Sequence, residues 1–327
     1  MKRFQTVSII GLGLIGGSFA LALKKSGYKG TVIGYDAAQS NLADALAAKA
    51  IDVAAASLDK SIIEAGLVVL AVPLGAYPII FRELAQVAKG RRFVLSDVGS
   101  VKTYVQHLAE ELLPDGAVFI GGHPMAGSER GGFAAARVEL FRGACYFLTP
   151  VATQQQELVS ALKEMVERLG ALPVVASPEE HDRVVAKVSH VPHLLAALLA
   201  GSLSSSEAPF VGSGFRDTTR IAAGNPQMWN DILMLNRGEI LTVIESIESV
   251  LKSVKTTLHS EDPLGLTCFL QQAKNARDGL PAGYKPALSG VCPQVYDQSC
   301  DSARDPRNNR KGSVASATPP GSNRNYN

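Results

Sequence analysis

Gly11-Leu12-Gly13-Leu14-Ile15-Gly16 is the stretch that decides the fold of the first half of this chain. It follows a short apolar run at residues 6–10, typical of a buried strand, and opens a small, apolar segment at 15–25 that predicts a helix. In such a unit the first glycine permits a tight turn, the second lets backbone N–H groups approach a pyrophosphate, and the third lets the helix pack on the sheet. The stretch therefore predicts a dinucleotide site at Gly11, Gly13, Leu14, Ile15 and Gly16; a purely structural glycine turn is the alternative.

An acidic residue supports the dinucleotide interpretation. Asp36 lies twenty residues after Gly16, at the end of the next predicted strand, 31–35. A carboxylate at this point can accept hydrogen bonds from the adenosine ribose. It would repel a 2′-phosphate, because two negative charges would be in contact. We therefore expect NAD rather than NADP as the cofactor.

Strand and helix signals alternate through the first half of the chain. Further strands are predicted at residues 67–72, 93–97, 118–122 and 145–149, and helices at 41–49, 79–88 and 102–112. Because parallel strands need crossover connections, this alternation predicts an α/β fold with a doubly wound parallel sheet of the Rossmann type. A helix at 155–169 and a strand at 172–175 are expected to close that sheet. Residues 1–177 are thus expected to form an NAD-binding domain.

Only helical periodicity follows Pro178, at residues 184–203, 226–235, 239–257 and 264–278. We expect an all-helical second domain over 178–284. One of its helices carries a long apolar stripe, formed by Ile240, Val243, Ile244, Ile247, Val250, Leu251 and Val254. Such a stripe indicates a partner helix, within the chain or from a second subunit, with ordinary core packing as the alternative.

Composition narrows the class of protein. A chain of 327 residues fits two domains, and 46% hydrophobic with 19% charged residues excludes a wholly disordered chain. Lys+Arg number 32 against 30 Asp+Glu, which gives no case for nucleic acid or an acidic membrane surface as partner. No signal peptide and no run of about 18 apolar residues is evident, so we expect no membrane span. Four cysteines without a CxxC pair indicate a reduced, cytoplasmic setting and no structural zinc.

Chemistry-bearing residues follow the predicted strands. Val72 and Pro73 end one strand, and the segment 97–102 ends another and opens a helix. Ligands of such sheets bind beyond the carboxyl ends of the strands. Ser100 can hydrogen-bond a substrate hydroxyl there, or it can be the N-cap of the helix that begins near Lys102.

The densest signal is the segment 121–129, in which a strand again runs into a glycine loop. His123 stands at the expected strand end, and Pro124 restricts the backbone next to it. A histidine at the ligand edge of a nicotinamide-binding fold is a natural proton acceptor for an alcohol being oxidised. A structural histidine is the alternative.

Two further blocks lie in the helical half. His181-Asp182 precedes His190 and His193, which are three residues apart and could form a metal pair; no third ligand at metal spacing is evident, so we expect no metal. In the segment 212–222, Arg216 and Arg220 flank Asp217. Because arginine binds carboxylates bidentately, one arginine is expected to bind substrate while Asp217 pairs with the other. A salt bridge that merely starts a helix is the alternative.

Together these blocks resemble the prephenate dehydrogenase family, which includes the arogenate and cyclohexadienyl dehydrogenases. The resemblance rests on GLGLIGGS, DVGSVK, GGHPMAGSE, the HD…SHVPH block, and GFRDTTRIA followed by Pro226 and Trp229, and it spans about residues 6–283. It implies that a ring alcohol is oxidised with hydride transfer to NAD while the ring carboxylate leaves as CO₂. For prephenate the product would be 4-hydroxyphenylpyruvate, on the route to tyrosine.

The resemblance also implies roles for single residues. His123 resembles the catalytic histidine, Ser100 the serine that orients the hydroxyl, and Arg220 the arginine that grips a substrate carboxylate. The acids that form an ionic gate with that arginine would be Glu129 and Asp217. His190, His193 and Trp229 match pocket positions, and the helical half would be a dimerisation domain that makes the protein a homodimer. The resemblance leaves open whether the substrate is prephenate or arogenate.

Two rival functions remain. A β-hydroxyacid-type dehydrogenase would need a catalytic lysine in the helical half, for which Lys187 is the obvious candidate. A non-catalytic NAD-binding regulator would not need His123 or Arg220, and both are present.

The last segment, residues 285–327, is rich in Pro, Ser, Asn and Arg and has no period, which predicts a disordered tail. Read from the second nucleotide of each codon, residues 305–317 can decode as Ile-Pro-Gly-Ile-Ile-Gly-Lys-Val-Ala-Ser-Leu-Leu-Leu. That sequence resembles the glycine turn and first helix of an ACT domain, a regulatory module that relatives often carry. We hypothesise a frameshift shortly after Leu288.

Overall fold

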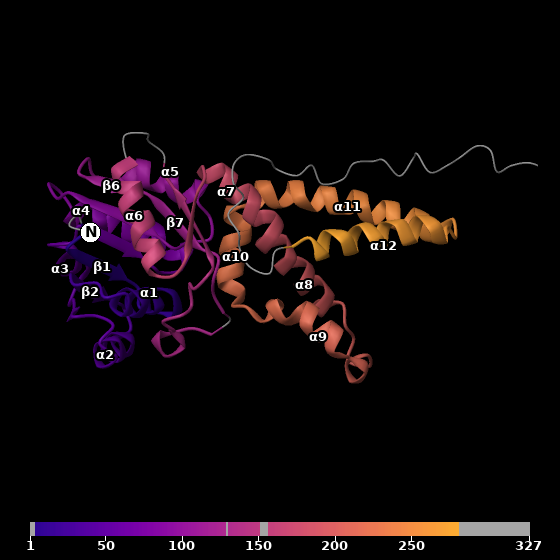
Figure 1. Ribbon diagram of the computed structural model, residues 1–327, viewed down its shortest axis with the longest axis horizontal. Coiled ribbons are helices and arrows are strands. Elements are labelled where there is room, and N and C mark those ends of the chain that lie inside the picture. Colours follow the sequence, from indigo (N-terminus) through magenta and orange to yellow (C-terminus); the bar gives the residue numbers. More distant parts are fainter. Residues whose placement is uncertain (1–3, 129, 151–155, 281–327) are drawn as a thin grey trace, which may run out of the picture.

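The computed structural model describes residues 4–128, 130–150 and 156–280. Its first half is built on a six-stranded sheet with the order β3-β2-β1-β4-β5-β6, in which every pair is parallel (Figure 1). This order confirms the doubly wound Rossmann-type sheet. The strands are β1 Thr6–Ile10, β2 Thr31–Tyr35, β3 Val53–Ala54, β4 Leu67–Leu70, β5 Phe93–Asp97 and β6 Ala117–Phe119.

Five helices connect these strands: α1 Leu14–Lys25, α2 Gln39–Ala47, α3 Leu58–Ile62, α4 Tyr77–Val87 and α5 Thr103–Leu112, with a 3₁₀ turn η1 at Leu74–Ala76. The two faces of the sheet bury separate cores. Phe19 of α1 and Val7 of β1 belong to one core, while Phe81 of α4 and Leu70 of β4 belong to the other. Because both faces are covered, the strands are almost continuously apolar. The short β3 and α3 have too few residues to show a period and were missed by the sequence analysis.

A second sheet corrects the expected topology. Strands β7 Gly121–Pro124, β8 Cys145–Thr149 and β9 Leu172–Val175 form a separate three-stranded sheet, with β7 antiparallel to β8. The predicted strand 118–122 is in fact split between the two sheets, and the helix α6 Gln156–Arg168 and β9 do not close the parallel sheet. A 3₁₀ turn, η2 Phe133–Ala135, lies between β7 and β8.

Two glycines explain why the chain leaves the first sheet. The N–H of Ile120 still donates to Leu95 of β5. A Cβ on Gly121 would lie 2.3 Å from Thr149 Oγ1, and one on Gly122 would lie 2.5 Å from the Asp97 carbonyl oxygen. No other residue fits this close crossing, which places His123 inside β7 rather than in a loop after a strand.

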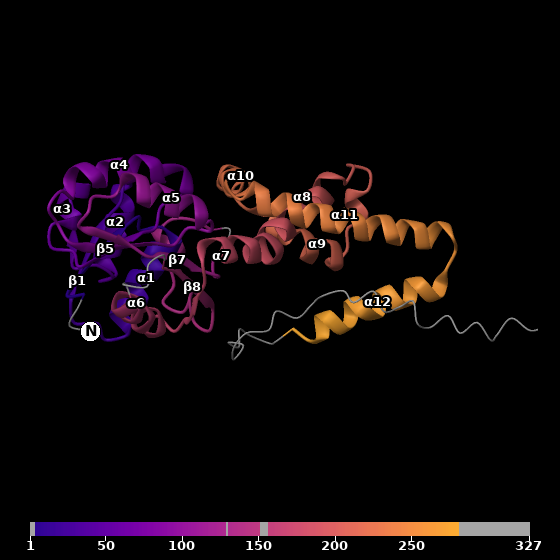
Figure 2. The same cartoon turned by 90° about the horizontal axis from the view of Figure 1, so that it is seen from above.

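The second half is helical, as expected, and extends away from the sheets (Figure 2). It begins with α7 Pro178–Val185, a π turn η4 Ala186–His190 and α8 Val191–Gly201. After the 3₁₀ turn η5 Ala208–Phe210 it continues through α9 Ser213–Thr219, the 3₁₀ turn η6 Arg220–Ala223, α10 Pro226–Leu235, α11 Arg237–His259 and α12 Pro263–Asp278. The predicted tail, 285–327, lies outside the described residues.

The apolar stripe of α11 has two different surroundings. Near its start, Ile240 is buried and packs with Ala186 and Val191. Further along, Leu251 is 59% exposed, and in α12 Leu264 is 81% exposed. Figure 2 shows α12 folding back from the far end of α11 as an open hairpin. The first half of the stripe therefore packs against the core of the helical half, whereas Leu251 in the second half remains largely exposed although α12 contacts α11.

The continuous helical run Pro178–Gly201 is long and apolar enough to cross a membrane, judged by length and composition alone. The segment is not an uninterrupted apolar run, because charged residues such as Glu180, Arg183 and Lys187 interrupt it, so the expectation of no membrane span stays a prediction. Its first turns carry His181 and Asp182, which are buried against the first domain. Core helices of globular proteins pass the same test.

Candidate active site

The glycine turn has the geometry that the sequence predicts. Gly11 has φ +92°, and a Cβ there would lie 2.4 Å from the Ala71 carbonyl oxygen. A Cβ on Gly16 would lie 1.9 Å from the Gly11 carbonyl oxygen, so α1 starts directly against the turn. By contrast, nothing lies within 4 Å of a Cβ on Gly13. The turn thus leaves open space beside the N-terminus of α1, where a pyrophosphate fits.

Asp36 follows β2 and holds this turn. Its carboxylate accepts hydrogen bonds from the N–H of Leu12 at 2.6 Å, the N–H of Ala38 at 2.7 Å and the side-chain amide of Asn41 at 3.1 Å. The side chain stays partly exposed, so its oxygens have lone pairs for ribose hydroxyls.

Val72 and Pro73 come next to this turn, at the end of β4. The Cγ1 atom of Val72 would lie 2.9 Å from a Cβ on Gly11. Pro73 is exposed, and Leu14 and Ile15 begin α1 across the turn. The predicted cofactor-binding residues therefore meet at one edge of the sheet.

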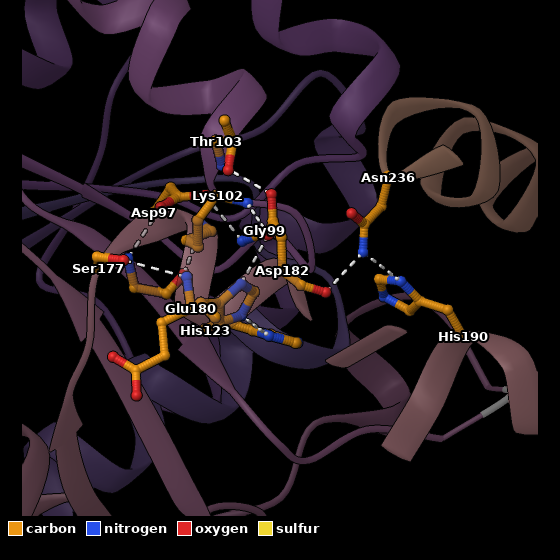
Figure 3. A network of polar contacts seen from close by, with 12 residues as sticks. Asp97, Gly99, Lys102, Thr103, His123, Ser177, Glu180, Asp182, His190 and Asn236 are labelled. Atoms are coloured by element: carbon orange, nitrogen blue, oxygen red, sulfur yellow. Dashed lines mark hydrogen bonds and ion pairs between the residues drawn. The ribbon is translucent and has the colours of Figure 1, made fainter. Parts of the chain in front are cut away.

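His123 lies in β7 with only 9% of its surface exposed. Its Nδ1 atom is 2.8 Å from Nε2 of His181, and Nδ1 of His181 is 2.8 Å from Oδ1 of Asp182. Figure 3 labels the two ends of this chain of contacts, His123 and Asp182. The chain links the second sheet to the first helix of the helical half. Ser177 caps that helix by accepting the N–H of Glu180, which fixes the first turn that presents His181 and Asp182.

Asp182 also caps helix α5 of the nucleotide-binding half. Its two oxygens accept the backbone N–H groups of Lys102 at 2.7 Å and Thr103 at 2.9 Å. Of the two roles considered for Ser100, the N-cap role is therefore wrong: the N-cap residue is Lys102, and a carboxylate from the other half satisfies the free N–H groups. Although burial opposes it, the hydrogen bonds from His181 and the two amides lower the pKa of Asp182.

A buried ion pair fixes the start of β7. The Lys102 ammonium contacts the Asp97 carboxylate and donates to the Gly122 carbonyl at 2.8 Å. Asp97 in turn accepts the N–H of Gly122 and the N–H of Gly99, both at 2.9 Å, and the Tyr77 hydroxyl at 3.1 Å. Both backbone groups of Gly122 are thus held next to His123. Neither Lys102 nor Asp97 had a predicted role, although both lie in the segment 97–102.

The predicted pocket residues of the helical half also converge. The ring of His193 stacks on Trp229, with centroids 3.5 Å apart and an angle of 11°. Asn236 donates from its amide to the Asp182 carbonyl at 2.9 Å, and the same nitrogen lies 3.1 Å from Nδ1 of His190. No sequence signal pointed to Asn236. Within the described ranges no three metal-ligating side chains gather, at His190 and His193 or elsewhere.

Burial keeps the histidines of this site neutral. It lowers the pKa of His123 well below the ordinary value, and the nearby His181 and Lys102 act in the same direction. The pKa of His181 is lowered by burial against the opposing effect of Asp182, and burial lowers the pKa of His190 to about 4. The partly buried Ser100 lies here, because its backbone faces His190. At neutral pH, His123 is therefore an uncharged ring that can accept a proton.

Arg220 and Asp217 lie in the helical half, between α8 and α10 in the sequence. Arg220 begins η6, which packs against α8, and both side chains are exposed. Within the described part of the chain, Asp217 forms no ion pair with Arg216 or Arg220, so the expected pairing is not formed in this structure. Exposure explains this, since an ion pair in water gains little. Glu129, the other predicted gate residue, lies outside the described residues.

A glycine turn for a dinucleotide, next to a buried neutral histidine at the ends of the strands, defines a nucleotide-dependent dehydrogenase. The family model for the nucleotide-binding domain of prephenate dehydrogenase matches residues 19–175, and that for its dimerization domain matches residues 177–272. The chain belongs to the prephenate dehydrogenase family.

Curated relatives of known name support this family assignment. The chain is 38% identical to the prephenate dehydrogenase of Bacillus subtilis over 91% of this chain and 81% of the relative. It is 33% identical to the cyclohexadienyl dehydrogenase of Zymomonas mobilis over 85% of this chain and 96% of the relative.

Solved structures of similar fold support the same family assignment. The prephenate dehydrogenase of Aquifex aeolicus, in complex with hydroxyphenyl propionate and NAD+, superposes with a TM-score of 0.77 at 31% identity. That match covers 84% of this chain and 97% of the other. Synechocystis arogenate dehydrogenase gives a TM-score of 0.71 at 30% identity, over 84% of this chain and 99% of the other.

Proposed function

We propose that this protein oxidises prephenate to 4-hydroxyphenylpyruvate and CO₂, with hydride transfer to NAD, in tyrosine biosynthesis. The observation that carries this proposal is the neutral His123, held by hydrogen bonds where the nucleotide-binding edge meets the helical half. A base is required at that point, because the ring hydroxyl must lose its proton as hydride leaves.

Each proposed catalytic or binding residue has a separate role in the reaction. His123 accepts the proton of the ring hydroxyl, and Ser100 orients that hydroxyl. Arg220 binds a substrate carboxylate as a bidentate partner, and its exposed guanidinium is free to do so. NAD supplies the hydride acceptor. The carbon–carbon bond to the ring carboxylate breaks, CO₂ leaves, and its electron pair completes the aromatic ring.

The residues that would hold NAD fit that cofactor. The open space at Gly13 leaves room for the pyrophosphate at the start of α1. Asp36 offers its carboxylate to the ribose hydroxyls and disfavours a 2′-phosphate. Val72 and Pro73 border the same edge.

Arogenate, which carries an amino group where prephenate has a keto group, is the second candidate substrate. It is kept because the structural relatives include an arogenate dehydrogenase. The β-hydroxyacid alternative loses support, since Lys187 is exposed and the buried lysine of the site, Lys102, is paired with Asp97.

We further propose a homodimer in a cytoplasmic setting. Residues 1–177 would bind NAD, and residues 178–284 would bind substrate and the second subunit. The exposed leucines of α11 and α12 support a dimer, because burying them would remove apolar surface from water. The buried Cys145 is a free thiol, which fits a reduced compartment.

The test follows NADH formation by absorbance, with prephenate or arogenate as substrate and NAD or NADP as cofactor. We expect the highest kcat/KM with prephenate and NAD, and a product identified as 4-hydroxyphenylpyruvate by chromatography. A preference for arogenate would select the second candidate. No NADH with either substrate would contradict both.

A further inference from the structure

We propose that His181 and Asp182 are positioning residues that dictate which ring nitrogen of His123 carries the proton, so that Nε2 of His123 is left as the base. This inference rests on the proposed role of His123 as proton acceptor. Neither His181 nor Asp182 received a role from the sequence analysis. The proposal is based on the hydrogen-bonded chain Asp182–His181–His123, whose two ends, Asp182 and His123, are labelled in Figure 3.

The chain of donors begins at Asp182. Its two oxygens face the backbone N–H groups of Lys102 and Thr103, which can only donate. Both oxygens are therefore acceptors, and the carboxylate is ionised at the N-terminus of α5. Since the third partner of this carboxylate is Nδ1 of His181, that nitrogen must carry a hydrogen and donate it.

The state of His181 follows. Its side chain is fully buried, and burial together with the nearby Lys102 ammonium outweighs the Asp182 carboxylate, so a second proton on the ring is disfavoured. A neutral ring with its hydrogen on Nδ1 has only a lone pair on Nε2. At 2.8 Å, this lone pair accepts the hydrogen of Nδ1 of His123.

The consequence for His123 is a single tautomer. With its hydrogen committed to Nδ1, its Nε2 bears the lone pair that can take a proton from substrate. A freely rotating or oppositely protonated ring would present an N–H instead, which cannot act as a base. When Nε2 accepts the proton, the resulting cation keeps donating to His181, and the Asp182 carboxylate stabilises it from one residue further away. No proton needs to pass from His123 to His181 in this step, and the proton on Nε2 leaves to solvent before the next turnover.

The other charged and titratable groups around the pair are compatible with this assignment. Lys102 and Asp97 neutralise one another on the α5 side. On the opposite side, His190 is neutral and is fixed by Asn236. Phe147 of β8 packs edge-on against His181, with centroids 5.0 Å apart, and so holds the ring in place. No further donor competes for Nε2 of His181 among the described contacts.

A matched pair of variants tests the proposal. In His181→Gln the amide can still donate to Asp182 and accept from His123, whereas His181→Leu can do neither. We expect kcat to fall about 10²-fold in His181→Leu and less than about tenfold in His181→Gln. The KM for prephenate and the Kd for NAD should change less than about threefold in both. His107→Leu, an exposed histidine of α5, serves as the control and should keep full activity.

The tautomer itself is measured by NMR on protein with ¹⁵N-labelled histidine, assigned with His123→Asn. We expect a protonated Nδ1 and a lone-pair Nε2 in the wild type and in His181→Gln, and mixed tautomers in His181→Leu. A wild-type ring protonated on Nε2 would overturn the proposal. So would a folded His181→Leu variant with unchanged kcat. If the wild type makes no NADH from prephenate or arogenate, the proposed function fails, while the NMR result still decides the tautomer.

Discussion

The carboxylate of Asp182 accepts the backbone N–H of Lys102 at 2.7 Å, so the helical half caps a helix of the nucleotide-binding half. Lys102 in turn uses its ammonium group to hold Gly122, the residue before His123. Through these two hydrogen bonds Lys102 connects both halves of the chain with the strand that carries His123.

Removing the charge of Asp182 should destabilise the protein. In Asp182→Asn one oxygen is replaced by an NH₂ group that faces an N–H donor, so we expect a loss of about 1–3 kcal/mol in the free energy of unfolding. Urea denaturation followed by circular dichroism measures it, with Asp44→Asn, an exposed aspartate of α2, as control.

The same variant should reveal a pH dependence. Because the pKa of Asp182 is lowered in the folded protein, its ionised form stabilises the fold above the ordinary aspartate pKa of about 4. This contribution is lost as the pH falls through the folded pKa. The difference between wild type and Asp182→Asn should thus be constant from pH 7 to pH 5 and shrink below about pH 4. A difference that grows on acidification would contradict this assignment.

His123→Asn should lose proton acceptance while keeping a hydrogen bond. We expect kcat to fall about 10²–10⁴-fold with a modest change in KM. Since burial holds the pKa of His123 well below its usual range, wild-type kcat should show no protonation step near pH 6.5 and should fall only at a clearly lower pH. A variant within a few-fold of wild type would remove His123 from the mechanism.

Arg220→Lys keeps the positive charge and loses the bidentate fork. We expect the KM for prephenate to rise about tenfold or more, with NAD binding unchanged. Arg216→Lys, one helical turn away and equally exposed, is the matched control and should leave KM unchanged. An equal effect of both substitutions would assign Arg220 to structure.

Asp36→Asn tests the choice of cofactor. The substitution keeps the shape of the side chain and removes the charge that would repel a 2′-phosphate. We expect the ratio of kcat/KM with NAD to that with NADP to fall at least about tenfold. Steady-state kinetics with both cofactors measure this ratio, again with Asp44→Asn as control. A wild type that prefers NADP would show that Asp36 does not select the cofactor.

The frameshift hypothesis is tested on the gene. We expect the alternate frame after about Leu288 to continue as an open reading of several tens of codons with a βαβ pattern. DNA sequencing past the stop codon decides it, and an early stop in that frame would end the hypothesis. The segment concerned lies outside the described residues.

The sequence alone predicted the parallel sheet, the dinucleotide turn and the helices α10 to α12, but not α3 or α9. These features are local: the glycine spacing of 11–16, the apolar strands and the helical periods of α10 to α12 are each written in short runs. Asp36 was found for the same reason, because its distance from the glycine turn is set by one strand and one helix. The residues His123, His193 and Trp229 were named from motifs, although their mutual geometry was not.

Tertiary structure decided what depends on contacts between distant segments. Only the close crossing at Gly121 and Gly122 moves His123 into a second sheet. The four residues of β7 are too few for a hydrophobic period that would predict this second sheet from the sequence. Asp182 caps a helix that begins 79 residues earlier at Thr103, so Ser100 was wrongly considered for that role. Asn236 has no motif at all. Its side chain matters only because α11 brings it against His190, since hydrogen bonds between elements depend on packing and leave no trace in local sequence.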